Sequence, residues 1–294
     1  MKVDIILPIY NSPKETRACI ESIIQTTPEE SYTLYLLDDC SPEPEIQSIT
    51  SYFSSKYNNV IAYRNEQNKG FPDNVNNGFR MTINDVVILN SDTIVTKGWL
   101  EGLYKASMSQ PKVAAVGPLS NYGMVTSVPS IYQEVNDSIG IEKVTKFIRN
   151  INSRLYPETP ILVGFCMYIT RDALNEIGLL DAETFKKGYG EETDWCLRAR
   201  EKGYKLLVAD DTYVYHVGGV SFGKEKLLLQ KRAAQIIRKR YPNYANEVQE
   251  FEENHPLLNL RVKMSKQLGV SLKYRVRYNL RRKKQLFKKL LIKK

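Results

Sequence analysis

Strand-like and helix-like segments alternate along the first 90 residues, and this alternation restricts the fold more than any other feature of the sequence. Four short apolar runs predict buried strands at residues 3–9, 32–37, 60–63 and 86–89. Helical patterns lie between them, at about residues 13–26, 43–57 and 71–81. Repeated strand–helix units form a parallel sheet with helices on both faces. The chain is therefore expected to be an α/β protein.

Polar residues follow each of these predicted strands. Asp38 and Asp39 end the second strand, and Asn90-Ser91-Asp92 ends the fourth. Ligands of open α/β sheets bind at the carboxyl ends of the strands. The two aspartates could accept hydrogen bonds from a nucleobase or a ribose, or one of them could cap the next helix. Asp92 offers the oxygen ligand that Mg²⁺ and Mn²⁺ prefer, or it could serve as a turn residue.

Two later clusters carry further chemistry. Three acidic residues lie at a predicted helix start, in the run GEETD at residues 190–194. They either complement the helix dipole or supply a general base that removes a proton from a hydroxyl group. His216 is one of only two histidines and precedes two glycines. It is either a metal ligand or a hydrogen-bonded loop residue. The other histidine, His255, is interpreted as having no function.

Five motifs in a fixed order resemble those of the family 2 glycosyltransferases. They are ILPIYN at 6–11, LLDDCSPE at 36–43, NEQNKG at 65–70, LNSDT at 89–93 with GWL at 98–100, and GEETDWCLR at 190–198. The resemblance covers about residues 3–223. It implies a GT-A fold, which is a Rossmann-like mixed sheet flanked by helices. It also implies inverting transfer of a sugar from a nucleotide diphosphate.

The resemblance implies a donor site at the strand ends and an acceptor site opposite it. The residues expected to contact the nucleotide or donor are Pro8, Tyr10, Asn11, Asp38, Asn65, Asn68, Gly70, Asn90, Ser91 and Asp92. Asp38 would bind the base. The expected acceptor-side residues are Gly164, Phe165 and Asp194, although Asp194 could instead support its helix.

Metal binding and catalysis are also implied by the resemblance. Asp92 and His216 would hold Mn²⁺ or Mg²⁺. The family usually has Asp-x-Asp at the metal motif, whereas this chain has Asn90 in the first place, a weaker ligand. Glu192 would be the catalytic base, and Glu191 would orient the acceptor.

The last 35 residues are strongly basic. Residues 260–294 hold 14 Lys and Arg and no acid, so within a net charge of +9 the other 259 residues carry −5. We expect a transferase domain at 1–223 and a helical, basic extension at 224–294. Leu286, Phe287, Leu290 and Leu291 recur at helical spacing, which predicts an amphipathic helix on an anionic membrane. A solvated or partner-packed helix is the alternative, and the charge has no nucleic-acid-binding motif beside it.

The expected function is transfer from a UDP-sugar or dTDP-rhamnose to a hydroxyl of a glycan or lipid-linked acceptor in cell-surface polysaccharide synthesis. No apolar run approaches the ~18 residues of a transmembrane helix, and the N-terminus has no signal-peptide pattern. We therefore expect a cytoplasmic protein, peripheral on the inner face of the membrane. A homo-oligomer is compatible with the sequence. The rival interpretations are a nucleotidyltransferase and a non-catalytic nucleotide-sugar- or glycan-binding module.

Overall fold

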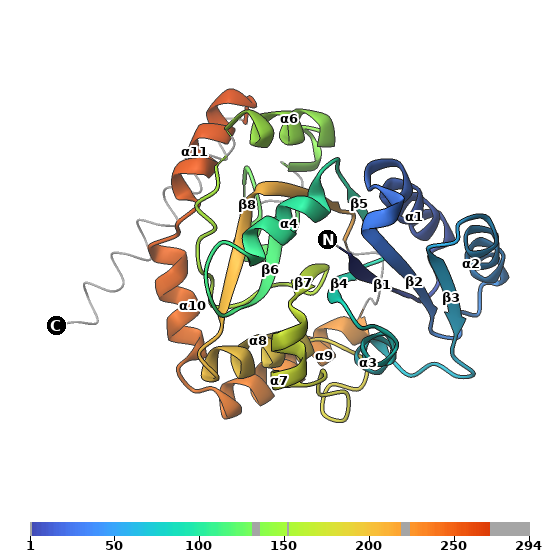
Figure 1. The fold of residues 1–294 in the computed structure, drawn as a ribbon. Helices are drawn as coiled ribbons and strands as arrows, with labels where there is room; N and C mark the ends of the chain where they lie inside the picture. Colours follow the sequence, from blue (N-terminus) through green and yellow to red (C-terminus); the bar gives the residue numbers. More distant parts are fainter. Residues whose placement is uncertain (1, 131–135, 152, 219–223, 271–294) are drawn as a thin grey trace.

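The computed structural model describes residues 2–130, 136–151, 153–218 and 224–270, which include eight strands in one curled sheet (Figure 1). The spatial order is β3-β2-β1-β4-β7-β6-β8-β5. The strands are β1 Val3–Ile9, β2 Tyr32–Asp38, β3 Val60–Arg64, β4 Asp85–Leu89, β5 Thr93–Val95, β6 Val113–Leu119, β7 Cys166–Ile169 and β8 Lys205–His216.

The sheet is mixed rather than wholly parallel. Strands β3, β2, β1 and β4 run parallel, as the alternating segments predict. Strand β7 is antiparallel to both β4 and β6, and β5 is antiparallel to β8. The mixed sheet that the resemblance implied is therefore confirmed, whereas alternation alone predicted only its parallel half.

Helices cover both faces of the sheet because alternate residues of the central strand point to opposite sides. Ile5 and Leu7 of β1 pack with α1 (Pro13–Thr26), α2 (Pro44–Lys56) and α4 (Trp99–Ser107). Ile6 packs with α3 (Phe71–Met81), α7 (Arg171–Ile177) and α8 (Glu191–Glu201). All seven residues of β1 are buried, which is the burial expected of a central parallel strand.

Strand β8 differs from its prediction, which was two short strands at residues 206–209 and 213–216. The polar run Asp210-Asp211-Thr212 predicts a break, yet the strand continues through it. Asp210 is buried because Ser153 Oγ and the backbone N–H of Tyr156 donate hydrogen bonds to its carboxylate.

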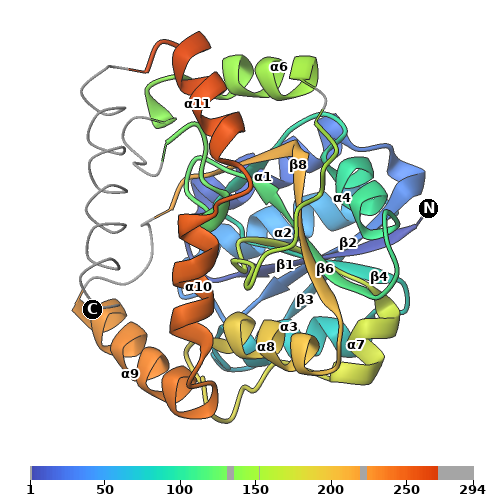
Figure 2. The same ribbon diagram turned by 90° about the vertical axis from the view of Figure 1, so that its left-hand side faces the viewer.

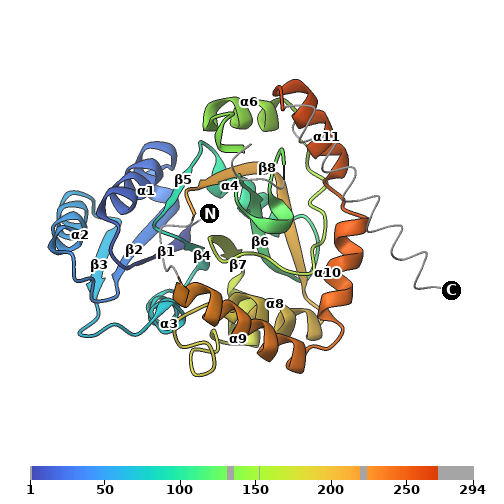
Figure 3. The ribbon, with the colours of Figure 1, turned by 180° about the vertical axis from the view of Figure 1, so that it is seen from behind.

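Three helices follow the sheet: the first runs along the bottom of the molecule, and the next two rise one after the other along one side (Figures 2 and 3). They are α9 Lys224–Arg240, α10 Tyr244–Glu253 and α11 Leu258–Gln267. Ala233 and Ile237 of α9 pack on Leu197 of α8. Met264 of α11 packs with Val144 of α6, which spans Ile141–Ile151. The boundary at 223/224 stays a prediction, and the described part of the extension is in close contact with the sheet domain.

The predicted amphipathic helix around Leu286–Leu291 lies outside the described residues. Within the described ranges, none of the helices combines the length and the apolar character needed to cross a bilayer.

Candidate active site

The ends of β1, β2 and β3 are tied together at Asp38. The backbone N–H of Asn11 donates to Ser41 Oγ at 2.9 Å, and the backbone N–H of Ser41 donates to Asp38 Oδ1 at 2.8 Å. Arg64, the last residue of β3, forms an ion pair with Asp38 Oδ2. Asp38 is only 1% exposed. The predicted base-binding residue is therefore held by an arginine that the motifs did not single out.

Asp39 shapes the turn that runs from Asn65 to Gly70. Its Oδ1 accepts hydrogen bonds from Asn65 Nδ2 and from the backbone N–H of Lys69, both at 2.8 Å. Its Oδ2 accepts from the backbone N–H of Gly70 at 2.9 Å. Gly70 has φ +85°, and a Cβ there would lie 2.1 Å from the carbonyl oxygen of Lys186. This position therefore requires glycine.

The other predicted nucleotide residues differ in exposure. Pro8 and Asn65 are buried, so their side chains lie under the surface of the site, out of reach of a ligand. Tyr10 is 41% exposed at the end of β1, and Asn68 is exposed in the turn after β3. Among these four, Tyr10 and Asn68 are thus the side chains that a ligand can reach.

Asp92 and His216 lie side by side because β5 and β8 pair in an antiparallel ladder. Thr93 is the register partner of His216, and the backbone N–H of Val217 donates to the Asp92 carbonyl at 2.9 Å. Nε2 of His216 lies 3.3 Å from Asp92 Oδ1. The ladder thus joins the two predicted metal ligands, which are far apart in the sequence.

The orientation of the His216 ring is fixed from its other edge. Nδ1 lies 3.0 Å from the carbonyl oxygen of Tyr122. A carbonyl only accepts hydrogen bonds, so Nδ1 carries the proton and Nε2 is directed at Asp92. Asn121 holds the His216 backbone, accepting from its N–H at 2.7 Å and donating to its carbonyl at 2.8 Å. Metal-binding histidines commonly have such a carbonyl partner.

This pair fits a divalent cation that is shared with a diphosphate. Mg²⁺-type ions are usually bound by one or two carboxylates together with substrate phosphates and waters. In the part of the chain that the structure describes, no three His, Cys, Asp or Glu side chains form a metal-binding group. The pair would therefore need ligands from the donor. Asn90 also has a buried Oδ1 with no hydrogen-bond partner, which suits a polar ligand group.

Residues Gly164 and Phe165 connect this pair to the acids of α8. The Phe165 ring stacks on the imidazole of His216, and the Phe165 carbonyl accepts from the backbone N–H of Asn90 at 2.8 Å. A Cβ on Gly164 would lie 3.5 Å from Cβ of Glu192. The predicted metal ligands, the predicted base, and Gly164 and Phe165 of the acceptor-side residues therefore lie near one another at one end of the sheet.

Glu191, which is 4% exposed, and the half-buried Glu192 form an acidic pair at the start of α8. Burial raises the pKa of both carboxyl groups, and repulsion by Glu192 raises the pKa of Glu191 further. A hydrogen bond between the two carboxyls favours the proton on Glu191 and the charge on Glu192. Each has an Oε2 that is buried without a hydrogen-bond partner. Glu191 therefore holds the proton, and Glu192 is the carboxylate of the two that is available to accept one.

The carboxylate of Asp194 is fully engaged by other side chains. It accepts hydrogen bonds from Arg198 Nε at 2.8 Å, from Arg240 at 2.7 Å and from the Tyr241 hydroxyl at 3.2 Å. These contacts link α8 to α9. They favour the helix-supporting role, and the acceptor-side role of Asp194 stays a prediction.

Arg64, Asn121 and Tyr122 are the neighbours of the site that sequence reasoning missed. Asn121 and Tyr122 lie in a run, SNYG, that predicts only a loop. No chemical pattern in that run indicates that Asn121 is 1% exposed and bound to His216. The one signal that could have indicated a role for these two residues is that their loop follows a strand of the sheet.

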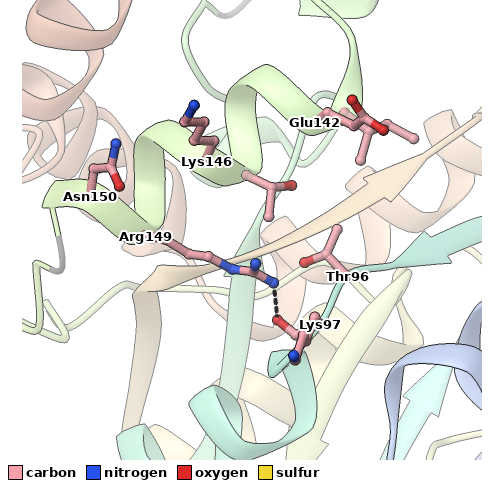
Figure 4. A pocket seen from close by; sticks show the side chains of 8 residues that line it. Thr96, Lys97, Glu142, Lys146, Arg149 and Asn150 are labelled. Atoms are coloured by element: carbon pink, nitrogen blue, oxygen red, sulfur yellow. Dashed lines mark hydrogen bonds between the residues drawn. The ribbon is translucent and has the colours of Figure 1, made fainter.

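One hollow of about 450 Å³ lies apart from these residues, between α6 and the turn after β5 (Figure 4). It is lined by Thr96, Lys97, Ile141, Glu142, Thr145, Lys146, Arg149 and Asn150. Arg149 closes part of it by donating to the carbonyl of Lys97 at 2.6 Å. None of the predicted site residues is among those that line it.

Comparison with solved structures identifies the fold. A structure of GalNAc-T7 with UDP, GalNAc and Mn²⁺ aligns at TM-score 0.64 and 15% identity, over 92% of this chain and 54% of the other. A mannosyltransferase from Pyrobaculum calidifontis, solved with GDP-Man and Mn²⁺, aligns at TM-score 0.58 and 14% identity, over 97% and 84% of the two chains. The chain therefore has the GT-A fold.

Sequence comparison supplies the family. A poly(ribitol-phosphate) β-glucosyltransferase of Bacillus spizizenii is 25% identical over 144 residues, which are 48% of this chain and 23% of the relative. The chain spans about half the length of the first curated relatives it matches, which are uncharacterized mycobacterial proteins. The family model described as Glycosyl transferase family 2 matches residues 4–178. Since the match covers more than half of the chain, this protein belongs to glycosyltransferase family 2.

Proposed function

We propose that this protein is an inverting glycosyltransferase that moves a sugar from a nucleotide diphosphate to an acceptor hydroxyl. One observation carries the proposal. Phe165 stacks on His216, the neighbour of Asp92, and a Cβ on the adjacent Gly164 would lie 3.5 Å from Cβ of Glu192. This proximity of the proposed cation-binding pair and the proposed base supports a displacement at an anomeric carbon, which needs both groups close to the reacting atoms.

In the proposed reaction, Glu192 accepts the proton of the acceptor hydroxyl. The hydroxyl oxygen forms a bond to the anomeric carbon while the bond from that carbon to the diphosphate oxygen breaks, and the electron pair leaves with the diphosphate. A single displacement from the opposite face inverts the anomeric centre. Asp92 and His216 would hold the cation, which neutralises charge on the leaving diphosphate when bound. Phe165 keeps the His216 ring in place and excludes water from its face.

The donor is proposed to lie along the ends of β1 to β4. Asp38 and Arg64 would meet the base, Tyr10 would flank it, and Asn90 would present its unpartnered Oδ1 to the ribose or sugar. UDP-sugars and dTDP-rhamnose are the proposed donors. Structural relatives solved with UDP and with GDP-Man support a nucleoside diphosphate.

The acceptor is proposed to be a glycan or lipid-linked glycan of the cell surface. Support comes from the name of the Bacillus relative, which acts on a poly(ribitol-phosphate). The basic residues after 260 are proposed to hold the protein on the inner membrane face.

Thermal unfolding with UDP, dTDP, GDP and CMP, each with and without Mn²⁺, tests the proposal. A ligand at ~100 times its dissociation constant adds about 2.7 kcal/mol of stability. We expect a Mn²⁺-dependent stabilisation with UDP or dTDP, followed by transfer from the matching sugar nucleotide. If no nucleotide stabilises the protein, the donor site is rejected. Binding without turnover for every donor and acceptor would favour the non-catalytic module.

A further inference from the structure

The start of α11 and the turn before it hold the backbone of a loop in the sheet domain. We call residues 120–129 the 120–129 loop. Arg261 donates from Nε to the carbonyl of Ser127 at 2.9 Å and from Nη2 to the carbonyl of Val125 at 2.8 Å. His255 Nε2 lies 2.9 Å from the same Val125 carbonyl. Ser265 Oγ donates to the carbonyl of Pro129 at 3.0 Å. Three alternate carbonyls of the loop are thus bound by one helical segment.

These contacts are buried. Arg261 is 3% exposed and His255 is 4% exposed. Nη1 of Arg261 has no hydrogen-bond partner, and the two carbonyls that it binds are uncharged. A buried guanidinium costs desolvation free energy, which the two neutral carbonyls and the nearby charge of Glu252 offset only in part. An apolar side chain would fill the same space at lower cost. The directed hydrogen bonds therefore point to a role in fixing the position of the loop.

The first residues of the 120–129 loop hold His216. Asn121 binds both backbone groups of His216, and the Tyr122 carbonyl binds its Nδ1. Inside the loop, the backbone N–H of Val128 donates to the Ser120 carbonyl at 2.8 Å. A shift of residues 125–129 would therefore be passed to Asn121 and Tyr122 through a short, hydrogen-bonded piece of backbone.

We propose that Arg261 and His255 are positioning residues that fix the 120–129 loop and, through Asn121 and Tyr122, hold His216 beside Asp92. The inference rests on the proposed function for the cation role of His216. Its consequence is that the extension after residue 223 is part of the active site's support. Arg261 is itself one of the basic residues counted from residue 260 onward.

The test compares Arg261→Met with Lys263→Met in the full chain. Both changes remove one positive charge from α11, but Lys263 is exposed and makes none of the loop contacts described above. Two quantities are measured: amide hydrogen exchange across residues 120–129, and the Mn²⁺ dissociation constant in the presence of UDP. For Arg261→Met we expect exchange in the loop to become ~10-fold faster. We expect Mn²⁺ binding to weaken by about 10-fold, the lower end of the effect of losing a partner of a metal ligand. Lys263→Met should match the wild type in both.

Three outcomes are distinguishable. Unchanged loop exchange in Arg261→Met overturns the inference. So does faster exchange with unchanged Mn²⁺ affinity, because the loop would then not control His216. If the wild type itself binds no Mn²⁺ with any nucleotide, the metal part of the proposed function fails, while the exchange data still report whether α11 holds the loop. Should Arg261→Met not fold, Ser265→Ala removes only the Pro129 contact and should give a smaller change of the same sign in both quantities.

Discussion

The imidazole of His216 lies flat on the phenyl ring of Phe165, with ring centroids 4.9 Å apart and planes inclined by 10°. The Tyr122 ring is a second neighbour, with its centroid 5.6 Å from that of the imidazole. Packing on these rings and the carbonyl of Tyr122 leave the ring little freedom to turn. Nε2 is therefore presented to Asp92 before any ligand binds.

This geometry predicts that Mn²⁺ acts on one histidine only. The chain has two histidines, so labelled-histidine NMR spectra should show two ring signals. We expect Mn²⁺ with UDP to broaden the His216 signal first, because the paramagnetic ion is proposed to bind at its Nε2. Asp92→Asn should abolish this broadening at the same Mn²⁺ concentration. Spectra of His255→Gln assign the signals, and broadening of the His255 signal alone would place the ion elsewhere.

The acidic pair of α8 predicts different effects of two isosteric substitutions. Glu192→Gln removes the proton acceptor, so transfer should fall by ~10²–10⁴-fold while donor binding is kept. Glu191→Gln is the same substitution one residue earlier, but it imitates the protonated, neutral state that the pair favours at Glu191 and so removes no charge. It should keep transfer within about 10-fold of the wild type. Initial rates and UDP binding measure both, and equal loss in the two variants would contradict the assignment of Glu192 as base.

The burial of His255 predicts that the folded protein loses stability in acid. Nδ1 accepts from the backbone N–H of Leu257 at 3.2 Å, so Nε2 carries the proton and donates to the Val125 carbonyl. Burial, with the charge of Arg261, lowers the pKa of His255 from 6.5 to about 3. Between these values the unfolded chain binds a proton that the folded chain does not, so stability should fall as pH falls, by about 1.4 kcal/mol per pH unit.

Urea unfolding at pH 7, 6, 5 and 4 checks this prediction. His255→Gln keeps a side-chain N–H donor but cannot take up the proton. The difference in unfolding free energy between the variant and the wild type should therefore shift in favour of the variant as pH falls from 7 to 4. A difference that stays constant with pH would show that His255 does not titrate as its burial requires.

The basic tail predicts binding to anionic vesicles. Each Lys or Arg near such a surface contributes on the order of 1 kcal/mol, and the attraction is screened by salt. Flotation with phosphatidylglycerol vesicles should recover the full chain, and a chain that ends at residue 270 should bind far less. Vesicles of neutral lipid serve as the control. Equal flotation of the two chains would reject the membrane role.

The first four strands agree with their predicted positions to within a residue because each is rich in apolar side chains and is followed by polar residues. The sequence could not show α4, whose residues are mixed, nor β5, which is only three residues long. It also could not show that β8 continues through Asp210, because the groups that satisfy this carboxylate come from residues 153 and 156.

For the site, the motifs indicate which chemical groups lie at the strand ends. They do not indicate which of these groups already form hydrogen bonds or ion pairs with other side chains of the protein. Asp38 is the example, since its pairing with Arg64 depends on the parallel registry of β2 and β3. Asp194 is another, because its partner Arg240 lies in a helix that no motif covers. Contacts of this kind depend on tertiary packing, which local sequence does not encode.

Asp92 and His216 belong to one β-ladder, whereas Glu192 stands on a helix that Arg240 ties to α9. The residues proposed to handle the leaving group and those proposed to handle the incoming group are therefore carried on separate structural units. On this proposal, substitutions in the unit that carries Glu192 would alter which acceptor is used and would leave the arrangement of Asp92 and His216 unchanged. New acceptor preferences would then arise by changes around α8 and α9, and exchange of these helices with a relative's would transfer the preference.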